Sequence, residues 1–165
     1  IEINIEMKGQ DDRLGKKVGE LVRANPLREK LILSCFSAAP LTGARSTCDV
    51  DIACLIGLPV RWPLTGLAIP LNFMQHIGAK IIHPNTRLLD ENFVDQAKSR
   101  GWAINSFCEL VGSEEDQDLD RLWTSLTAWE IDGHCTNQPR QLKKWIGNIH
   151  GLKVIHKEAQ LQMER

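Results

Sequence analysis

A carboxylate and an ammonium group lie close together near the start of the chain, in the stretch INIEMKG at residues 3–9. Side chains alternate between the two faces of a β-strand, so Glu6 and Lys8 share one face of the strand that this stretch predicts. The opposite face is apolar and carries Ile3, Ile5 and Met7. One interpretation is a functional site that holds the two charges side by side. The other is an ordinary strand with one polar face in water, and this stretch alone leaves both open.

Polar residues also gather at the ends of several later apolar runs. In a parallel α/β fold, the chemistry takes place at the carboxyl ends of the strands. Taken singly, His83 is typical of a hydrogen-bonded structural histidine, and Thr136 with Asn137 is typical of a helix cap. Repeated at the same end of successive strands, such residues instead indicate a polar mouth on an apolar sheet. The strand-end polar residues are Ser34, His83, Asn105, Ser106, Thr136 and Asn137.

The runs that position these residues alternate six times between strand and helix patterns. Short apolar runs predict strands over residues 3–8, 31–36, 51–57, 79–84, 102–107 and 131–137. Apolar residues at helical spacing predict helices over residues 11–24, 37–47, 70–78, 90–101, 119–131 and 139–149. This order is typical of parallel strands joined by helical crossovers. An open doubly wound sheet and a (β/α)8 barrel both satisfy it, and no glycine-rich loop supports the dinucleotide-binding version.

The spacing of apolar residues also predicts which face of each helix is buried. Asp90 is expected to cap the helix over residues 90–101, and Gly101 to close it. The expected apolar faces are Leu14, Val18, Leu21 and Val22 in the first helix, Phe93, Val94 and Ala97 in the fourth, and Leu119, Leu122, Trp123 and Leu126 in the fifth.

Charge and composition exclude several classes of partner. The formal net charge of −1 gives no general electrostatic case for binding nucleic acid or an anionic membrane. No apolar run approaches the ~20 residues that cross a bilayer, so no transmembrane segment is expected. The five cysteines never form a C-x-x-C pair. We interpret them as buried free thiols, which fit a reducing compartment such as the cytoplasm.

Five motifs together resemble one enzyme family. IEMK, LILSCF, IIHP, DENFVDQAKSRG and IDGHCTNQP occur in the order and approximate spacing of the glycerophosphodiester phosphodiesterase family. The chain to about residue 146 is similar to the C-terminal two-thirds of such a domain. The resemblance implies a partial TIM (β/α)8 barrel with six of the eight βα units, strands three to eight. Residues 1–165 would then form the C-terminal part of the domain, with a C-terminal extension after about residue 147.

The resemblance implies an activity and a set of site residues. The family hydrolyses glycerophosphodiesters to glycerol 3-phosphate and an alcohol, with calcium or magnesium. Glu6 matches a carboxylate ligand of the metal, which suits a hard cation. Lys8 matches a catalytic cation that faces the phosphoryl oxygens, where an ammonium stabilises developing negative charge. His83 and Phe107 match positions that line the substrate mouth, whereas Asp132, Gly133, Thr136 and Asn137 match a mainly structural motif.

The chain also departs from the family. The two catalytic histidines, the arginine that follows and two further metal carboxylates would lie on strands outside this sequence, so the chain alone is expected to be inactive. On the seventh strand only an aromatic residue, Phe107, is kept, and the segments at 61–70 and 112–120 are longer than usual. One alternative is an inactive barrel of the same family that serves as a binding or regulatory module. Another is an α/β protein whose strand-end polar groups only cap helices.

Overall fold

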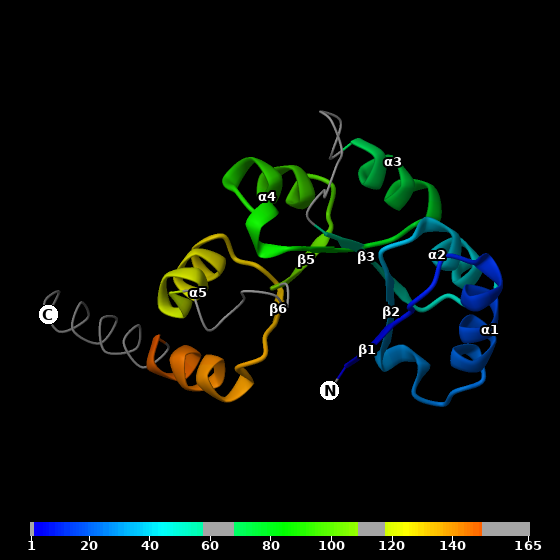
Figure 1. The fold of residues 1–165 in the computed structure, drawn as a ribbon, viewed down its shortest axis with the longest axis horizontal. Helices are drawn as coiled ribbons and strands as arrows, with labels where there is room; N and C mark the ends of the chain where they lie inside the picture. The colour runs from blue at the N-terminus through cyan, green and yellow to red at the C-terminus, as the bar shows by residue number, and fades with distance from the viewer. Residues whose placement is uncertain (1, 58–67, 109–117, 150–165) are drawn as a thin grey trace, which may run out of the picture. The chain divides into compact units, whose positions relative to one another are not determined.

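The computed structural model describes residues 2–57, 68–108 and 118–149, and strands and helices alternate along them (Figure 1). Residues 139–149 form a further helix after the last strand. The strands are β1 (Ile3–Glu6), β2 (Leu31–Cys35), β3 (Asp51–Ile56), β4 (Ile81–Pro84), β5 (Ala103–Phe107) and β6 (Gly133–Cys135). The helices are α1 (Asp12–Arg23), α2 (Ala38–Arg45), α3 (Ala68–Ile77), α4 (Glu91–Lys98) and α5 (Leu119–Ala128), with short 3-10 turns at Arg28–Lys30 and Thr86–Leu88.

The strands form one sheet in sequential order, β1-β2-β3-β4-β5-β6, over the part of the chain that is described. The first four pairs of neighbours are parallel, and β6 adjoins β5. Figure 1 shows β1 to β5 following a curve, with α1, α2, α3 and α4 on its outer side. The arrangement is a partial TIM barrel, which confirms the prediction of parallel strands in sequential order. No switch point breaks that order in the described strands, so the doubly wound alternative does not apply.

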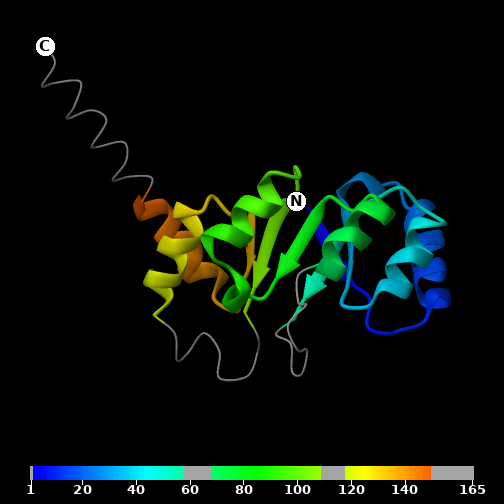
Figure 2. The ribbon, with the colours of Figure 1, turned by 90° about the horizontal axis from the view of Figure 1, so that it is seen from above.

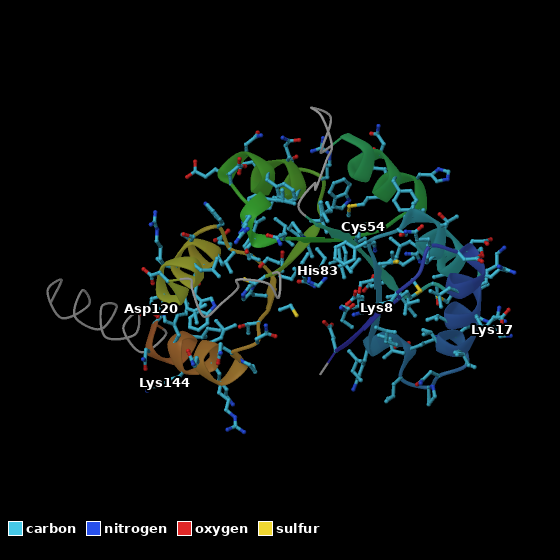
Figure 3. The ribbon with its side chains drawn as sticks, in the orientation of Figure 1. Lys8, Lys17, Cys54, His83, Asp120 and Lys144 are labelled. Atoms are coloured by element: carbon cyan, nitrogen blue, oxygen red, sulfur yellow. The ribbon has the colours of Figure 1, made fainter. Side chains whose placement is uncertain are left out.

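The register divides the side chains of the sheet into two faces. On the outer face, Leu33 pairs with Ile52 and Cys35 pairs with Cys54, and all four are buried. On the inner face, Glu6 pairs with Ser34, Ser34 with Ala53, and Ala53 with Ile81. Figure 3 shows Cys54 and His83 on opposite sides of the sheet, as the register requires.

Helices α1 and α2 pack so closely that glycine is required between them. A Cβ atom at Gly15 would lie 1.8 Å from the carbonyl oxygen of Pro40, and one at Gly43 would lie 2.1 Å from that of Asp12. This contact turns Gly15, Gly19 and Val22 into the buried face of α1. The apolar face expected from the sequence is therefore wrong at Leu21, whose side chain is 70% exposed.

Helix α4 begins and ends as its sequence predicts. The Asp90 carboxylate accepts a hydrogen bond of 2.7 Å from the Phe93 backbone N–H, which is an N-cap. Phe93, Val94 and Ala97 are buried, as expected. Gly101 has φ +70°, a left-handed conformation that glycine adopts at little cost after a helix.

Two compact units divide the chain, residues 1–107 with 131–134 and residues 108–130 with 135–165. In the second unit, α5 lies beside the helix over residues 139–149 (Figures 1 and 2). The rings of Trp123 and Trp145 join these helices, with centroids 5.8 Å apart. Trp123 and Leu126 are buried, as expected for α5. The acidic segment at 112–120, the segment at 61–70 and the extension after residue 147 lie wholly or largely outside the described residues.

None of the five cysteines, all of which the structure describes, forms a disulfide. Cys35, Cys48 and Cys54 are buried, as expected, and Cys108 is half-buried. The expectation is wrong for Cys135, which is exposed at the end of β6. No helix in the described ranges is both long and apolar enough to cross a bilayer.

Candidate functional site

Glu6 and Lys8 lie at the carboxyl end of β1. Glu6 is the last residue of the strand and pairs with Ser34 of β2, which places it on the inner face. The Lys8 ammonium lies 3.9 Å from the Glu6 carboxylate, and their side chains are 81% and 39% exposed. An exposed ion pair of this kind stabilises a fold by at most about 1 kcal/mol. Both groups are therefore accessible to a ligand, and folding stability alone does not require them.

Three aromatic rings lie together at the carboxyl ends of β2, β4 and β5. The rings of His83 and Phe107 meet edge to face, with centroids 5.6 Å apart and planes at 85°. Phe107 meets Phe36 in the same manner, with centroids 5.8 Å apart and planes at 82°. His83 is buried, whereas Phe36 is 54% exposed. We call Phe36, His83 and Phe107 the aromatic cluster.

Several polar atoms near this cluster are buried without a hydrogen-bond partner. They are the Ser34 hydroxyl, both ring nitrogens of His83 and the Asn85 side-chain nitrogen. Each unsatisfied polar group of this kind costs a fold about 1–3 kcal/mol. Ser34 on β2 and His83 on β4 both lie on the inner face, with β3 between their strands. Such a concentration at the carboxyl ends of parallel strands is typical of a ligand site.

Burial keeps the His83 ring uncharged. Its removal from water lowers the pKa of His83 from the ordinary 6.5 to about 4. The Ser106 backbone lies close to the ring and favours the charged form, without making a well-directed hydrogen bond, and nearby His134 acts the other way. At neutral pH the ring therefore carries one N–H donor and one acceptor nitrogen.

The four residues implied by the resemblance form two separate groups. Glu6 contacts Lys8, and His83 contacts Phe107. Between β1 and β4 stand β2 and β3, so three strand spacings, roughly 14 Å along the sheet, separate the two groups. Glu6 and His83 share the inner face, and Figure 3 shows Lys8 near the end of β1 and His83 on the inner side of the curve. The roles of all four stay predictions.

Three residues of the motif IDGHCTNQP make structural contacts. The Asp132 carboxylate accepts a hydrogen bond of 2.8 Å from the Ile104 backbone N–H, which ties the start of β6 to β5. A Cβ atom at Gly133 would lie 2.5 Å from the side-chain oxygen of Asn105, so glycine leaves room for that amide. The Thr136 hydroxyl accepts from the backbone N–H of Gln138 at the start of the last helix, at 3.0 Å.

The sequence analysis did not predict a polar contact between Ser106 and His134. The Ser106 hydroxyl lies 2.9 Å from Nδ1 of His134, which joins β5 to β6. Ser106 follows outward-facing Ile104 by two positions, so it lies on the outer face of the sheet rather than with His83. The sequence does contain the pattern that would have predicted the outward position of Ser106. Along β5, Asn105 and Phe107 alternate with Ile104 and Ser106, so the two pairs lie on opposite faces.

The described residues do not make a complete metal site. No group of three His, Cys, Asp or Glu side chains among them could hold a metal ion. Glu6 brings one carboxylate, whereas Ca²⁺ takes six to eight oxygen ligands and Mg²⁺ takes six. The Lys8 ammonium also competes for that carboxylate. Calcium or magnesium therefore does not fit these residues on their own.

Comparison with solved structures supports the fold. A candidate glycerophosphodiester phosphodiesterase from Galdieria sulphuraria has a TM-score of 0.74 at 18% identity, covering 89% of this chain and 57% of its own. An Oleispira antarctica phosphodiesterase in complex with the product sn-glycerol-3-phosphate has a TM-score of 0.65 at 16% identity, covering 89% of this chain. The fold is that of part of a TIM barrel. The chain spans little more than half of these two proteins, since it covers 57% and 56% of their lengths.

A protein with a different activity also has a similar fold. The deoxyribose phosphate aldolase from Aeropyrum pernix has a TM-score of 0.58 at 15% identity, covering 81% of this chain and 60% of its own. No protein-family model and no curated protein sequence matches the chain. The glycerophosphodiester phosphodiesterases named above match with higher TM-scores, so this chain has a partial barrel similar to theirs.

Proposed function

We propose that these residues form the larger part of a metal-dependent phosphodiester hydrolase. Its substrates would be glycerophosphodiesters, which it would cleave to glycerol 3-phosphate and an alcohol. The observation that carries the proposal is the inner position of Glu6, at the carboxyl end of β1 and beside Lys8, in a fold similar to that of the phosphodiesterases. In parallel barrels, residues at this end of the strands are the ones that carry chemistry.

Each proposed role follows from the chemistry of the side chain. Lys8 would attract the phosphate and stabilise the negative charge that builds on its oxygens during hydrolysis. Its high exposure leaves the ammonium free to turn toward a ligand. Phe107 would cover one side of the organic group, and its contacts with Phe36 and His83 hold its ring in place.

The metal and the proton transfers need groups that the described residues do not bring together. Glu6 would supply one carboxylate, and the other ligands would come from outside the described residues. The proposal assigns no acid–base role to His83, because a pKa of about 4 leaves it without an acidic proton at neutral pH and makes it a weak base. The catalytic histidines that the resemblance implies would likewise lie outside this sequence.

The proposal is tested with the natural full-length protein that contains these residues and with the 165-residue chain alone. The full-length protein should release glycerol 3-phosphate from glycerophosphocholine, and a chelator should stop the release. The chain alone should show none, because general acid–base groups each contribute roughly 10²–10⁴-fold. Absence of activity in the full-length protein with added calcium or magnesium would favour the inactive, ligand-binding alternative. Turnover by the chain alone would overturn our placement of the catalytic groups.

A further inference from the structure

Three residues with sulfur in their side chains form a row across β1, β2 and β3, on the outer face of the sheet. Cys35 of β2 pairs in register with Cys54 of β3. Continuing the β1–β2 register by one pair places Met7 on the other side of Cys35. The Met7 backbone N–H donates to the Ser34 carbonyl oxygen at 2.7 Å, which extends that ladder. All three are buried, and we call Met7, Cys35 and Cys54 the sulfur row.

The surroundings of Cys35 suit a negatively charged sulfur that lies close to the surface. The backbone N–H of Ser37, at the N-terminus of α2, donates to Cys35 Sγ at 3.4 Å. Both an N–H donor and the N-terminal end of a helix stabilise a thiolate. The same Sγ lies 3.0 Å from the carbonyl oxygen of Met7 and 3.8 Å from that of Gly9. Gly9 is exposed, so this buried sulfur lies only one residue below the surface.

Strand geometry favours an ion between Cys35 and Cys54 over a disulfide. Neighbouring strands lie about 4.7–4.9 Å apart, and the side chains of a register pair leave the sheet in the same direction. A disulfide needs Cβ atoms about 3.5–4.5 Å apart, so the two strands would have to move together. Two metal–thiolate bonds of about 2.3 Å span up to about 4.6 Å, which matches the strand spacing. Burial, and then the neighbouring Cys35, raise the pKa of Cys54 to about 12, and a thiol that keeps its proton is a poor nucleophile for disulfide exchange.

We propose that the sulfur row is a binding site for a soft monovalent metal ion, Cu(I), with two thiolates and one thioether as its ligands. Thiolate and thioether sulfurs are the ligands that Cu(I) prefers. Zn²⁺ takes four ligands, and no group of even three His, Cys, Asp or Glu side chains that could hold it exists among the described residues. Each thiol loses its proton when it binds, so the ion replaces up to two protons. The proposal does not depend on the hydrolase, whose site lies on the inner face.

The test is a competition for Cu(I), without oxygen, between the reduced natural full-length protein that contains these residues and a chelator that changes colour when it binds Cu(I). Cys35→Ala and Cys54→Ala should each weaken binding by roughly 100-fold or more, because loss of a direct ligand exceeds the roughly 10–100-fold that loss of an outer partner costs. Met7→Leu keeps the volume without the thioether and should weaken binding roughly tenfold. Cys48→Ala is the matched control, because Cys48 is also a buried thiol that donates to a backbone carbonyl, at 3.3 Å. It should leave the affinity unchanged.

X-ray absorption at the copper edge identifies the ligands in the unmodified protein, so it decides the proposal even if a variant does not fold. The spectrum of the Cu(I)-loaded protein should show two or three sulfur neighbours. Oxygen or nitrogen neighbours alone, or no binding in competition with the chelator, would overturn the proposal. An affinity for Zn²⁺ equal to that for Cu(I) would overturn it too. So would affinities of Cys35→Ala and Cys54→Ala that equal the affinity of Cys48→Ala.

Discussion

The ring of Phe107 stands edge-on to the ring of His83, with their centroids 5.6 Å apart and their planes at 85°. The two residues come from neighbouring strands, β4 and β5, and each lies near the carboxyl end of its strand. Edge-to-face packing of this kind orders the imidazole and adds about 0.5–1.5 kcal/mol to the energy of burial. The contact helps to keep the His83 ring buried, and burial is what lowers the pKa of His83.

Acid should destabilise the protein through His83. Its pKa is about 4 in the folded protein and about 6.5 in the unfolded chain, so the unfolded state binds more protons between these values. The stabilisation is fully present above pH 6.5 and is lost as the pH falls toward 4. We expect the free energy of unfolding to fall by about 2 kcal/mol more in the unmodified protein than in His83→Gln between pH 7 and pH 4.5.

Denaturant unfolding at several pH values measures this difference. His76→Gln is a matched control, because it removes an exposed histidine from α3 and leaves the buried His83 ring in place. An identical pH dependence in His83→Gln and the unmodified protein would mean that the His83 ring is charged or solvated in the folded state.

The glycine contact between α1 and α2 should not tolerate a methyl group. In Gly15→Ala the new Cβ would fall 1.8 Å from a backbone carbonyl oxygen, so the helices would have to separate. We expect the free energy of unfolding to fall by about 2–3 kcal/mol. In Gly147→Ala nothing lies within 4 Å of the new Cβ, and alanine should stabilise that helix by up to about 1 kcal/mol. Equal thermal stability of the two variants would show that α1 and α2 are not so close.

The carboxylate of Asp132 should matter as a hydrogen-bond acceptor rather than as a charge. Its partner is the backbone N–H of Ile104, a residue that is fully buried. Asp132→Ala leaves that N–H without its partner and should cost about 1–3 kcal/mol of unfolding free energy. Asp132→Asn keeps an acceptor and should cost clearly less. Equal losses in the two variants, measured by denaturant unfolding, would point to a role for the charge.

The sequence predicts the strands better than it predicts the faces of the helices. Alternation of apolar and polar residues places Glu6 on the inner face because a strand has a simple two-residue period. The same reasoning fails for Leu21, because glycine carries no hydrophobic signal and the face of α1 is decided by how closely α2 approaches. Tertiary contact of this kind cannot be read from the period of one helix.

The candidate site is predictable in part for a related reason. The sequence predicts that His83 and Phe107 lie at the carboxyl ends of their strands. The contact between their rings, however, depends on the register of β4 and β5. The alternation along β5 places Ser106 on the other face from Phe107, but its contact with His134 depends on how β6 lies beside β5. Neither feature follows from residue types, because a shift of one residue would exchange the two faces.

Lys8 should contribute to turnover without contributing to metal binding. In the natural full-length protein, Lys8→Ala removes a cation that would stabilise the charged transition state, and we expect turnover of glycerophosphocholine to fall roughly 100-fold. The affinity for calcium or magnesium should not decrease. Lys17→Ala is a matched control, because Lys17 is also an exposed lysine, 80% accessible, but lies on α1 (Figure 3). Equal activities of the two variants would exclude a catalytic role for Lys8.

The central claim is that Glu6 is a functional carboxylate, and the substitution Glu6→Gln in the natural full-length protein tests it most directly. The measurement is the metal-dependent release of glycerol 3-phosphate, compared with that of Glu20→Gln, which removes an exposed carboxylate from α1. Glu6→Gln changes one charge and almost no volume at an exposed position, so unfolding free energy should change by less than about 0.5 kcal/mol. We expect release to fall at least 100-fold in Glu6→Gln and to stay unchanged in Glu20→Gln. Normal activity and metal affinity in Glu6→Gln would show that Glu6 is an ordinary surface residue at the end of a strand.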